Sequence, residues 1–150
     1  MSYKLLFICT GNICRSPMAE GLAPSIAAEY QHEVEAKSAG TLGLIDYTAD
    51  PKAVEVIKER KLDISGHRSK EITRELIVWA DYILVMERKH ASHVRANFPD
   101  GREKILELGS FGSFAEISDP VGRWKFTFRK NRNQIEKCLH SFFRQLPKRS

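Results

Sequence analysis

Cys9 and Arg15 lie six residues apart near the amino terminus, a spacing that suits attack of a thiolate on a phosphate ester. The intervening residues are enough to form a loop whose backbone N–H groups converge on one anion. Gly11 and Asn12 within it tolerate the left-handed backbone that so tight a loop requires. The planar guanidinium of an arginine binds two phosphate oxygens at once. We therefore predict that Cys9 is a nucleophile and that Arg15 holds the phosphoryl group in the transition state.

The segments on either side of this loop support that interpretation. Tyr3 to Cys9 is an apolar run that predicts a buried strand, and Ser16–Pro17 predicts a helix start with Ser16 as its N-cap. A helix N-terminus carries about half a positive charge, which favours the thiolate form of a nearby cysteine. Ser16 can also donate a hydrogen bond to that thiolate. An isolated cysteine and arginine would more often be a buried strand residue and an exposed charge, so the agreement of strand, turn and helix favours catalysis.

Short apolar runs alternate with amphipathic stretches along the rest of the chain. Further strands are predicted at Val34 to Ser38, Tyr82 to Met86 and Lys104 to Leu108. A first helix is predicted from Ser16 toward Tyr30, with a kink or early break at Pro24. A second is predicted from Asp50–Pro51 through Ile57. Three more helices are predicted at Ile72 to Ala80, Arg88 to Phe98 and Trp124 to Leu146. The segments Leu62 to Lys70 and Phe111 to Gly122 are predicted to be irregular. This alternation predicts an α/β fold, a parallel sheet with helices on both faces, and a site beyond the carboxyl ends of the strands.

The composition fits one domain over residues 1–150, with 42% hydrophobic and 29% charged residues. No apolar run approaches the roughly 18 residues that cross a bilayer, and the early run Leu5 to Ile8 is too short for a signal-peptide core. We therefore expect a cytoplasmic protein with no membrane partner. In that reducing compartment its three cysteines should be free thiols.

No metal or other cofactor is expected. Cys9 and Cys14 lack a second close pair of cysteines, and His90 and His93 have no cysteine near them in the sequence.

The net charge of +5 is moderate, and basic residues gather near the carboxyl terminus at Lys125, Arg129, Lys130 and Arg132. Such a cluster suits a nucleic-acid interface, the solvated side of a helix, or a field that attracts an anionic substrate. Charge alone does not decide among these three. The motifs point to an anionic substrate, so no nucleic-acid partner is expected.

Two Asp–Pro pairs are candidates for the general acid that a phenolate leaving group requires. Asp50 stands directly before an amphipathic helix, where an N-cap explains it better. Asp119 follows the fourth predicted strand in a loop at the expected catalytic edge, and Pro120 should stiffen that loop. We therefore predict that Asp119 is the acid.

The segment CTGNICRSP after LLFI resembles the phosphate-binding loop of the low-molecular-weight protein tyrosine phosphatases. The likeness continues, in the order of that family, at Ser38–Ala39–Gly40–Thr41, Asp50–Pro51, His67–Arg68, Asp81–Tyr82–Ile83 through Met86, and Asp119–Pro120. It implies a four-stranded parallel sheet flanked by helices, with the phosphate-binding loop after the first strand. It also implies hydrolysis of phosphotyrosine in proteins through a phosphocysteine intermediate, with Asp119 first as acid and then as base.

The same resemblance implies roles for residues around the loop. The phosphate-binding loop comprises Thr10, Gly11, Asn12, Ile13, Cys14 and Ser16, and hydrogen bonds from Ser38 and His67 should brace it. Relatives carry aromatic residues after Asp–Pro, where this chain has Val121 and Gly122. The predicted substrate slot therefore consists of Ile13, Leu44, Val121 and Trp124, with Trp124 folding back in place of the missing aromatics.

Several alternatives remain open. Phosphoarginine phosphatases of this family carry threonine where Ile13 stands, and arsenate reductases of this fold need two further cysteines that are absent between Cys14 and Cys138. A silent anion-binding or RNA-binding module would use the basic carboxyl-terminal helix, but it would not need the intact catalytic residues. Cys14 is either core packing or a resolving thiol that forms a disulfide with oxidised Cys9. Cys138 is predicted to be core.

Overall fold

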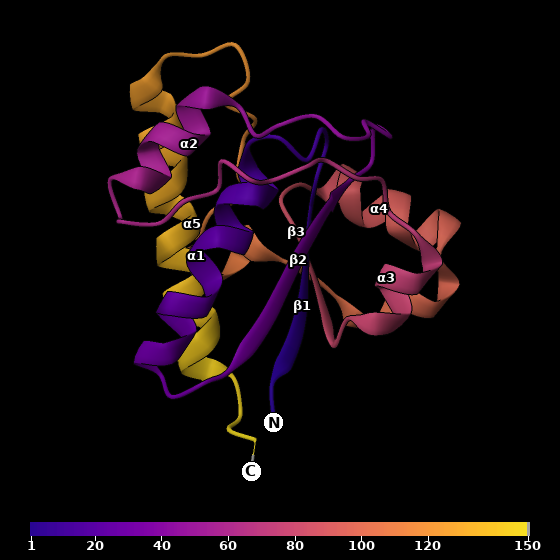
Figure 1. The fold of residues 1–150 in the computed structure, drawn as a ribbon. Coiled ribbons are helices and arrows are strands. Elements are labelled where there is room, and N and C mark those ends of the chain that lie inside the picture. Colours follow the sequence, from indigo (N-terminus) through magenta and orange to yellow (C-terminus); the bar gives the residue numbers. More distant parts are fainter. Residues whose placement is uncertain (150) are drawn as a thin grey trace.

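Four parallel strands form one sheet in the order β2–β1–β3–β4 in the computed structural model, which describes residues 1–149 (Figure 1). The strands are β1 (Tyr3–Cys9), β2 (Val34–Gly40), β3 (Tyr82–Val85) and β4 (Ile105–Glu107). Cys9 pairs with Gly40, so β1 and β2 end side by side at the carboxyl edge of the sheet. The predicted α/β fold and its four-stranded parallel sheet are confirmed.

Helices cover both faces of this sheet (Figure 1). On one face lie α1 (Arg15–Glu29), α2 (Pro51–Lys58) and α5 (Lys125–Gln145), and on the other lie α3 (Arg74–Trp79) and α4 (Arg88–Asn97). Two short 3₁₀ helices, η1 (Pro99–Lys104) and η2 (Leu108–Gly112), flank β4. None of the helices described in residues 1–149 combines the length and the apolar character that a membrane crossing requires.

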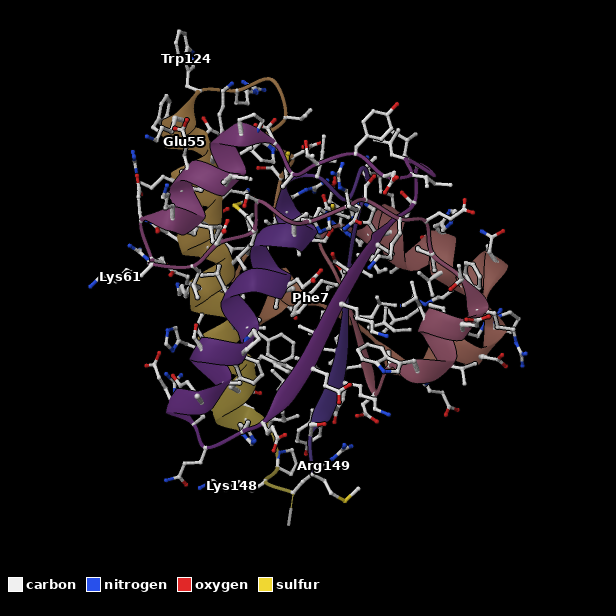
Figure 2. The ribbon with its side chains drawn as sticks, viewed as in Figure 1. Phe7, Glu55, Lys61, Trp124, Lys148 and Arg149 are labelled. Atoms are coloured by element: carbon white, nitrogen blue, oxygen red, sulfur yellow. The ribbon has the colours of Figure 1, made fainter. Side chains whose placement is uncertain are left out.

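The alternation of side chains along β1 divides the core into two layers. Leu5, Phe7 and Cys9 belong to the cluster packed by α1, α2 and α5, whereas Leu6 and Ile8 belong to the cluster packed by α3 and α4. Phe7 can be followed in Figure 2, between the sheet and α1. A strand buried on both faces reads as a continuous apolar run, which is why the sequence predicts β1 to the residue.

Three local predictions are wrong. Ser16 is not the N-cap of α1, because the helix begins at Arg15 and the Ser16 hydroxyl is hydrogen-bonded within the phosphate-binding loop. The helix does not break at Pro24, because that residue lies on its exposed side, where water can take the carbonyl that the missing N–H leaves free. β2 extends past Ser38 to Gly40, because those residues pair with the end of β1. The other predicted strands and helices match within two residues at their ends.

Asp50 caps α2, as predicted. Its side chain accepts a hydrogen bond from the backbone N–H of Lys52 at 2.9 Å, and Pro51 occupies the first helical position. The buried face of the helix carries Ala53, Val56 and Ile57.

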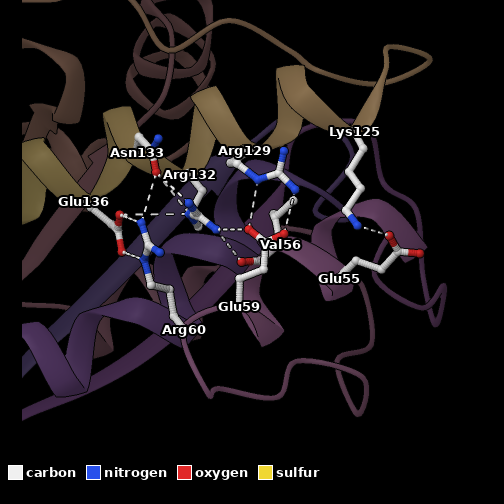
Figure 3. A network of polar contacts seen from close by, with 9 residues as sticks. All are labelled: Glu55, Val56, Glu59, Arg60, Lys125, Arg129, Arg132, Asn133 and Glu136. Carbon is white, nitrogen blue, oxygen red and sulfur yellow. Dashed lines mark hydrogen bonds and ion pairs between the residues drawn. The ribbon is translucent and has the colours of Figure 1, made fainter.

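A polar network joins α2 to α5 and uses most of the basic cluster (Figure 3). The almost fully buried Arg132 donates to Val56 O at 2.8 Å and to Glu59 Oε1 at 2.6 Å, and Arg129 also pairs with Glu59 at 2.6 Å. Hydrogen bonds from Arg129, then from Arg132, lower the pKa of Glu59 to about 2. Lys125 pairs with Glu55 at 3.1 Å. These cations hold two helices together, so most of the cluster belongs to the fold.

Candidate active site

The loop between β1 and α1 places Cys9 at the helix N-terminus. Asn12 has a positive φ of 57°, the left-handed conformation that the sequence predicts for this turn. Its side chain donates to Ser16 Oγ at 2.8 Å, and Ser16 Oγ lies 2.9 Å from Cys9 Sγ. An amide N–H can only donate, so Ser16 Oγ accepts from Asn12 and has its own proton to donate to Cys9. This direction stabilises a thiolate at Cys9.

Residues from distant elements brace Asn12. Its Nδ2 also donates to Ser38 Oγ at 2.9 Å, and its Oδ1 accepts from the backbone N–H of Lys70 at 3.0 Å. His67 Nε2 bonds to the backbone carbonyl of Asn12 at 2.7 Å, and Ser38 in turn bonds to Glu20. The structure thus brings Ser38 and His67, the two residues predicted to brace the loop, into contact with Asn12. A left-handed asparagine persists because its neighbours over-determine it.

Arg15 is the first residue of α1, directly after the loop, and only 1% of its surface is exposed. Its Nη1 donates to Glu87 Oε2 at 2.5 Å and to Ile117 O at 2.8 Å, and its Nη2 is 3.8 Å from Asp119 Oδ2. Its Nε has no hydrogen-bond partner among residues 1–149. A buried guanidinium N–H without a partner is costly, so this donor suits an anionic ligand.

Sequence reasoning missed Glu87, although a signal was available. Glu87 directly follows the strand predicted at Tyr82 to Met86, and the carboxyl ends of parallel strands are where sites form.

Asp119 reaches the same cavity as Cys9 from the loop after η2. One oxygen, Oδ1, accepts from Val121 N at 3.0 Å, a turn that holds the half-exposed carboxyl in place. The structure therefore places the two Asp–Pro pairs differently: Asp119 lines the cavity together with Cys9, whereas Asp50 caps α2.

The cavity above Cys9 has a volume of about 170 Å³. Its apolar wall consists of Ile13, Leu42, Leu44 and Val121. Leu42 was not predicted, because nothing in its local pattern distinguishes it from other loop residues. A larger hollow of about 590 Å³ beside α3 is lined by Arg74, Glu75, Val78 and Trp79, and it contains none of the predicted catalytic residues.

Trp124 does not belong to the slot, which corrects the prediction. Its side chain is 77% exposed and points outward from the start of α5 (Figure 2). The segment is held on α2, because Lys52 Nζ donates to the carbonyl of Arg123 at 2.7 Å and Lys125 pairs with Glu55. These contacts keep Trp124 from folding back over the cavity.

The other two cysteines are buried. Burial, then the charges of Asp50 and Cys9, raises the pKa of Cys14 well above its ordinary value, and burial raises the pKa of Cys138 to about 11. Both are therefore neutral thiols near pH 7. Among residues 1–149, no three His, Cys, Asp or Glu side chains are grouped so that they could hold a metal ion.

Gly40 permits the close approach of β2 to the loop, and an alanine there should disturb the site. An added Cβ would lie 2.6 Å from Thr10 O and 3.1 Å from Asn12 N. We expect Gly40→Ala to lower the free energy of unfolding by about 1–3 kcal/mol and to reduce kcat/KM, because the displaced atoms belong to the phosphate-binding loop. Thermal unfolding and turnover measure the two effects. Gly66→Ala is the control, since its Cβ meets nothing within 4 Å; equal behaviour of both variants would contradict the expectation.

The family model for the low molecular weight phosphotyrosine protein phosphatases matches residues 4–150. With the geometry of Cys9, Arg15 and Asp119, this places the chain in that family, whose members are cysteine-dependent hydrolases of phosphorylated proteins.

Its relatives include enzymes named for two different substrates. The protein-arginine-phosphatase of Bacillus subtilis (strain 168) is 35% identical over 146 residues, covering 96% of this chain and 97% of the relative. The low molecular weight protein-tyrosine-phosphatase Wzb of Escherichia coli (strain K12) is 34% identical over 146 residues, covering 97% of each chain. A solved structure of the YwlE arginine phosphatase, a mutant with a phosphorylated active-site serine, has a TM-score of 0.89 and 32% identity, covering 95% of this chain and 94% of the other.

Proposed function

We propose that this protein hydrolyses phosphotyrosine in proteins through a phosphocysteine intermediate on Cys9. The observation that carries the proposal is the convergence of three groups on one cavity: Cys9 beside the Ser16 hydroxyl, the buried guanidinium of Arg15, and the carboxyl of Asp119.

In the first step, the Cys9 thiolate attacks phosphorus while the bond from phosphorus to the phenol oxygen breaks. Arg15 binds the equatorial oxygens of the transition state, where an oriented charge contributes most. Asp119 gives its proton to the departing oxygen, so the products are a neutral phenol and phosphocysteine.

In the second step, the carboxylate of Asp119 takes a proton from water as that water attacks phosphorus. The sulfur–phosphorus bond breaks, inorganic phosphate leaves, and Cys9 returns to a thiolate that accepts the Ser16 hydrogen bond. The phosphorylated active-site serine in the mutant relative supports a covalent route.

The apolar wall of the cavity favours a phenyl ring over a guanidinium. Ile13, Leu42, Leu44 and Val121 offer contact area but no side-chain acceptor. A guanidinium entering there would lose hydrogen bonds to water that this wall does not replace. Phosphoarginine is the second candidate substrate. It is supported by the name of the Bacillus relative, a protein-arginine-phosphatase, but not by the apolar wall of the cavity.

The ratio of kcat/KM for matched phosphotyrosine and phosphoarginine peptides tests the choice of substrate. We expect phosphotyrosine to be preferred, and Ile13→Thr to narrow or reverse the ratio, because its hydroxyl offers a polar partner worth about 1–3 kcal/mol. Ile13→Val is the matched control, since valine keeps the branched apolar shape. A parent enzyme that prefers phosphoarginine would overturn the substrate assignment but not the chemistry at Cys9.

A further inference from the structure

A chain of hydrogen bonds from the start of α4 fixes the direction of one proton in the loop. His90 lies in the first turn of α4 and is fully buried. Its Nδ1 lies 3.0 Å from the backbone N–H of Glu87, which can only donate. In the neutral ring, Nδ1 is therefore the acceptor, and the proton is on Nε2. Nε2 lies 2.9 Å from Thr10 Oγ1, so His90 donates to that hydroxyl.

The surroundings keep the His90 ring neutral. Burial, then the positive charges of Arg15 and Lys89, lowers the pKa of His90 to about 3, against the opposing charges of Glu116 and Asp119. The tautomer set by the Glu87 N–H therefore persists through the neutral pH range.

The oxygen of Thr10 receives a second donor. Arg15 Nη2 lies 3.4 Å from Thr10 Oγ1, so His90 and Arg15 together occupy both acceptor positions of this hydroxyl. Its own proton must then be donated to a third group. Thr10 is among the residues that line the cavity above Cys9, so a ligand in that cavity is a candidate acceptor for this proton.

We propose that the Thr10 hydroxyl donates a hydrogen bond to a nonbridging oxygen of the bound phosphoryl group, and that His90 is the positioning residue that makes it a donor. This inference rests on the proposed function, since it adds a side-chain contact to the same site. Arg15 and the loop N–H groups are the other donors to the phosphoryl oxygens. Because the Thr10 hydroxyl is already held in a fixed direction, it does not have to reorient as charge develops on those oxygens.

Inorganic phosphate is the first probe, with its dissociation constant measured by NMR titration beside kcat/KM for para-nitrophenyl phosphate. Thr10→Val keeps the branched shape without the hydroxyl, and Thr10→Ser keeps the hydroxyl without the methyl group. For Thr10→Val we expect about a 10- to 100-fold fall in kcat/KM and weaker phosphate binding, the cost of one hydrogen bond to a charged group. Thr10→Ser keeps the donor, so its losses in kcat/KM and in phosphate binding should be much smaller than those of Thr10→Val.

Two results of this experiment would overturn the inference: phosphate binding by Thr10→Val that equals the parent's, or equal losses in Thr10→Val and Thr10→Ser. If Thr10→Val turned over more slowly but bound phosphate as the parent does, the Thr10 hydroxyl would be assigned a hydrogen bond to Cys9 Sγ rather than to the phosphoryl group, and the inference would be overturned. A parent that binds phosphate without turnover would count against the proposed function, not against this contact.

His90 is tested by its own readouts. His90→Leu removes the donor, so the Thr10 hydroxyl can turn away, and phosphate binding should weaken. In the Thr10→Val background, His90→Leu should not weaken phosphate binding any further, because no hydroxyl remains for His90 to direct. The ¹⁵N shifts of the parent's His90 ring should report a neutral ring protonated on Nε2. A proton on Nδ1, or additive losses in the double variant, would contradict the positioning role.

Discussion

Cys9→Ser should abolish turnover while the fold stays intact. The site supplies a hydrogen bond from Ser16 and a helix N-terminus, which stabilise a thiolate, whereas a serine hydroxyl stays almost fully protonated at neutral pH. We expect kcat to fall by about 10⁴-fold or more, as when other enzymes lose a nucleophile. Turnover of para-nitrophenyl phosphate measures the loss, and thermal unfolding checks the fold.

Cys138→Ala is the matched control for Cys9→Ser. Cys138 is a buried thiol on α5 and does not line the cavity, so its loss should cost some stability but leave turnover near that of the parent. Substantial activity in Cys9→Ser would remove Cys9 from its assigned role.

The second large effect is expected for Asp119→Asn, and it should depend on the leaving group. Asparagine can keep the hydrogen bond from Val121 N but cannot protonate a phenolate. Substrates with poor leaving groups, such as phenyl phosphate, should lose about 10²–10⁴-fold in kcat, whereas activated esters should lose far less in the first step. The measurement is the slope of log kcat/KM, which reports the first step, against leaving-group pKa.

Asp50→Asn controls for the other Asp–Pro pair. Asparagine is as good an N-cap as aspartate, so α2 should stay intact and the leaving-group slope should not change. Equal, small losses in Asp50→Asn and Asp119→Asn would show that neither carboxyl is the acid.

The sequence predicts this fold well because its signals are local. β1 and β3 are apolar runs buried on both faces, and α2 carries its own cap and amphipathic pattern. The loop from Cys9 to Arg15 is also local: strand, left-handed turn and helix start follow one another, so chemistry and position are in the same few residues.

The missed features depend on tertiary contacts. Glu87 and His90 matter because α4 brings them against Arg15 and Thr10, and no local pattern records that contact. Trp124 was misplaced for the same kind of reason, since contacts with α2 fix where α5 begins.

Ser16 was misassigned because two roles compete for one hydroxyl. A serine before proline predicts a helix cap, but here Asn12 and Cys9 occupy its oxygen and proton.

Trapping the covalent intermediate tests the central claim most directly. In Asp119→Asn supplied with para-nitrophenyl phosphate, the first step needs little acid but the second step still needs the missing base. Phosphocysteine should therefore accumulate, and denaturing quench at early times followed by peptide mass spectrometry should find a phosphoryl group on Cys9 in step with the nitrophenol burst. Nitrophenol release with no phosphoryl group on Cys9 at any time would contradict the account.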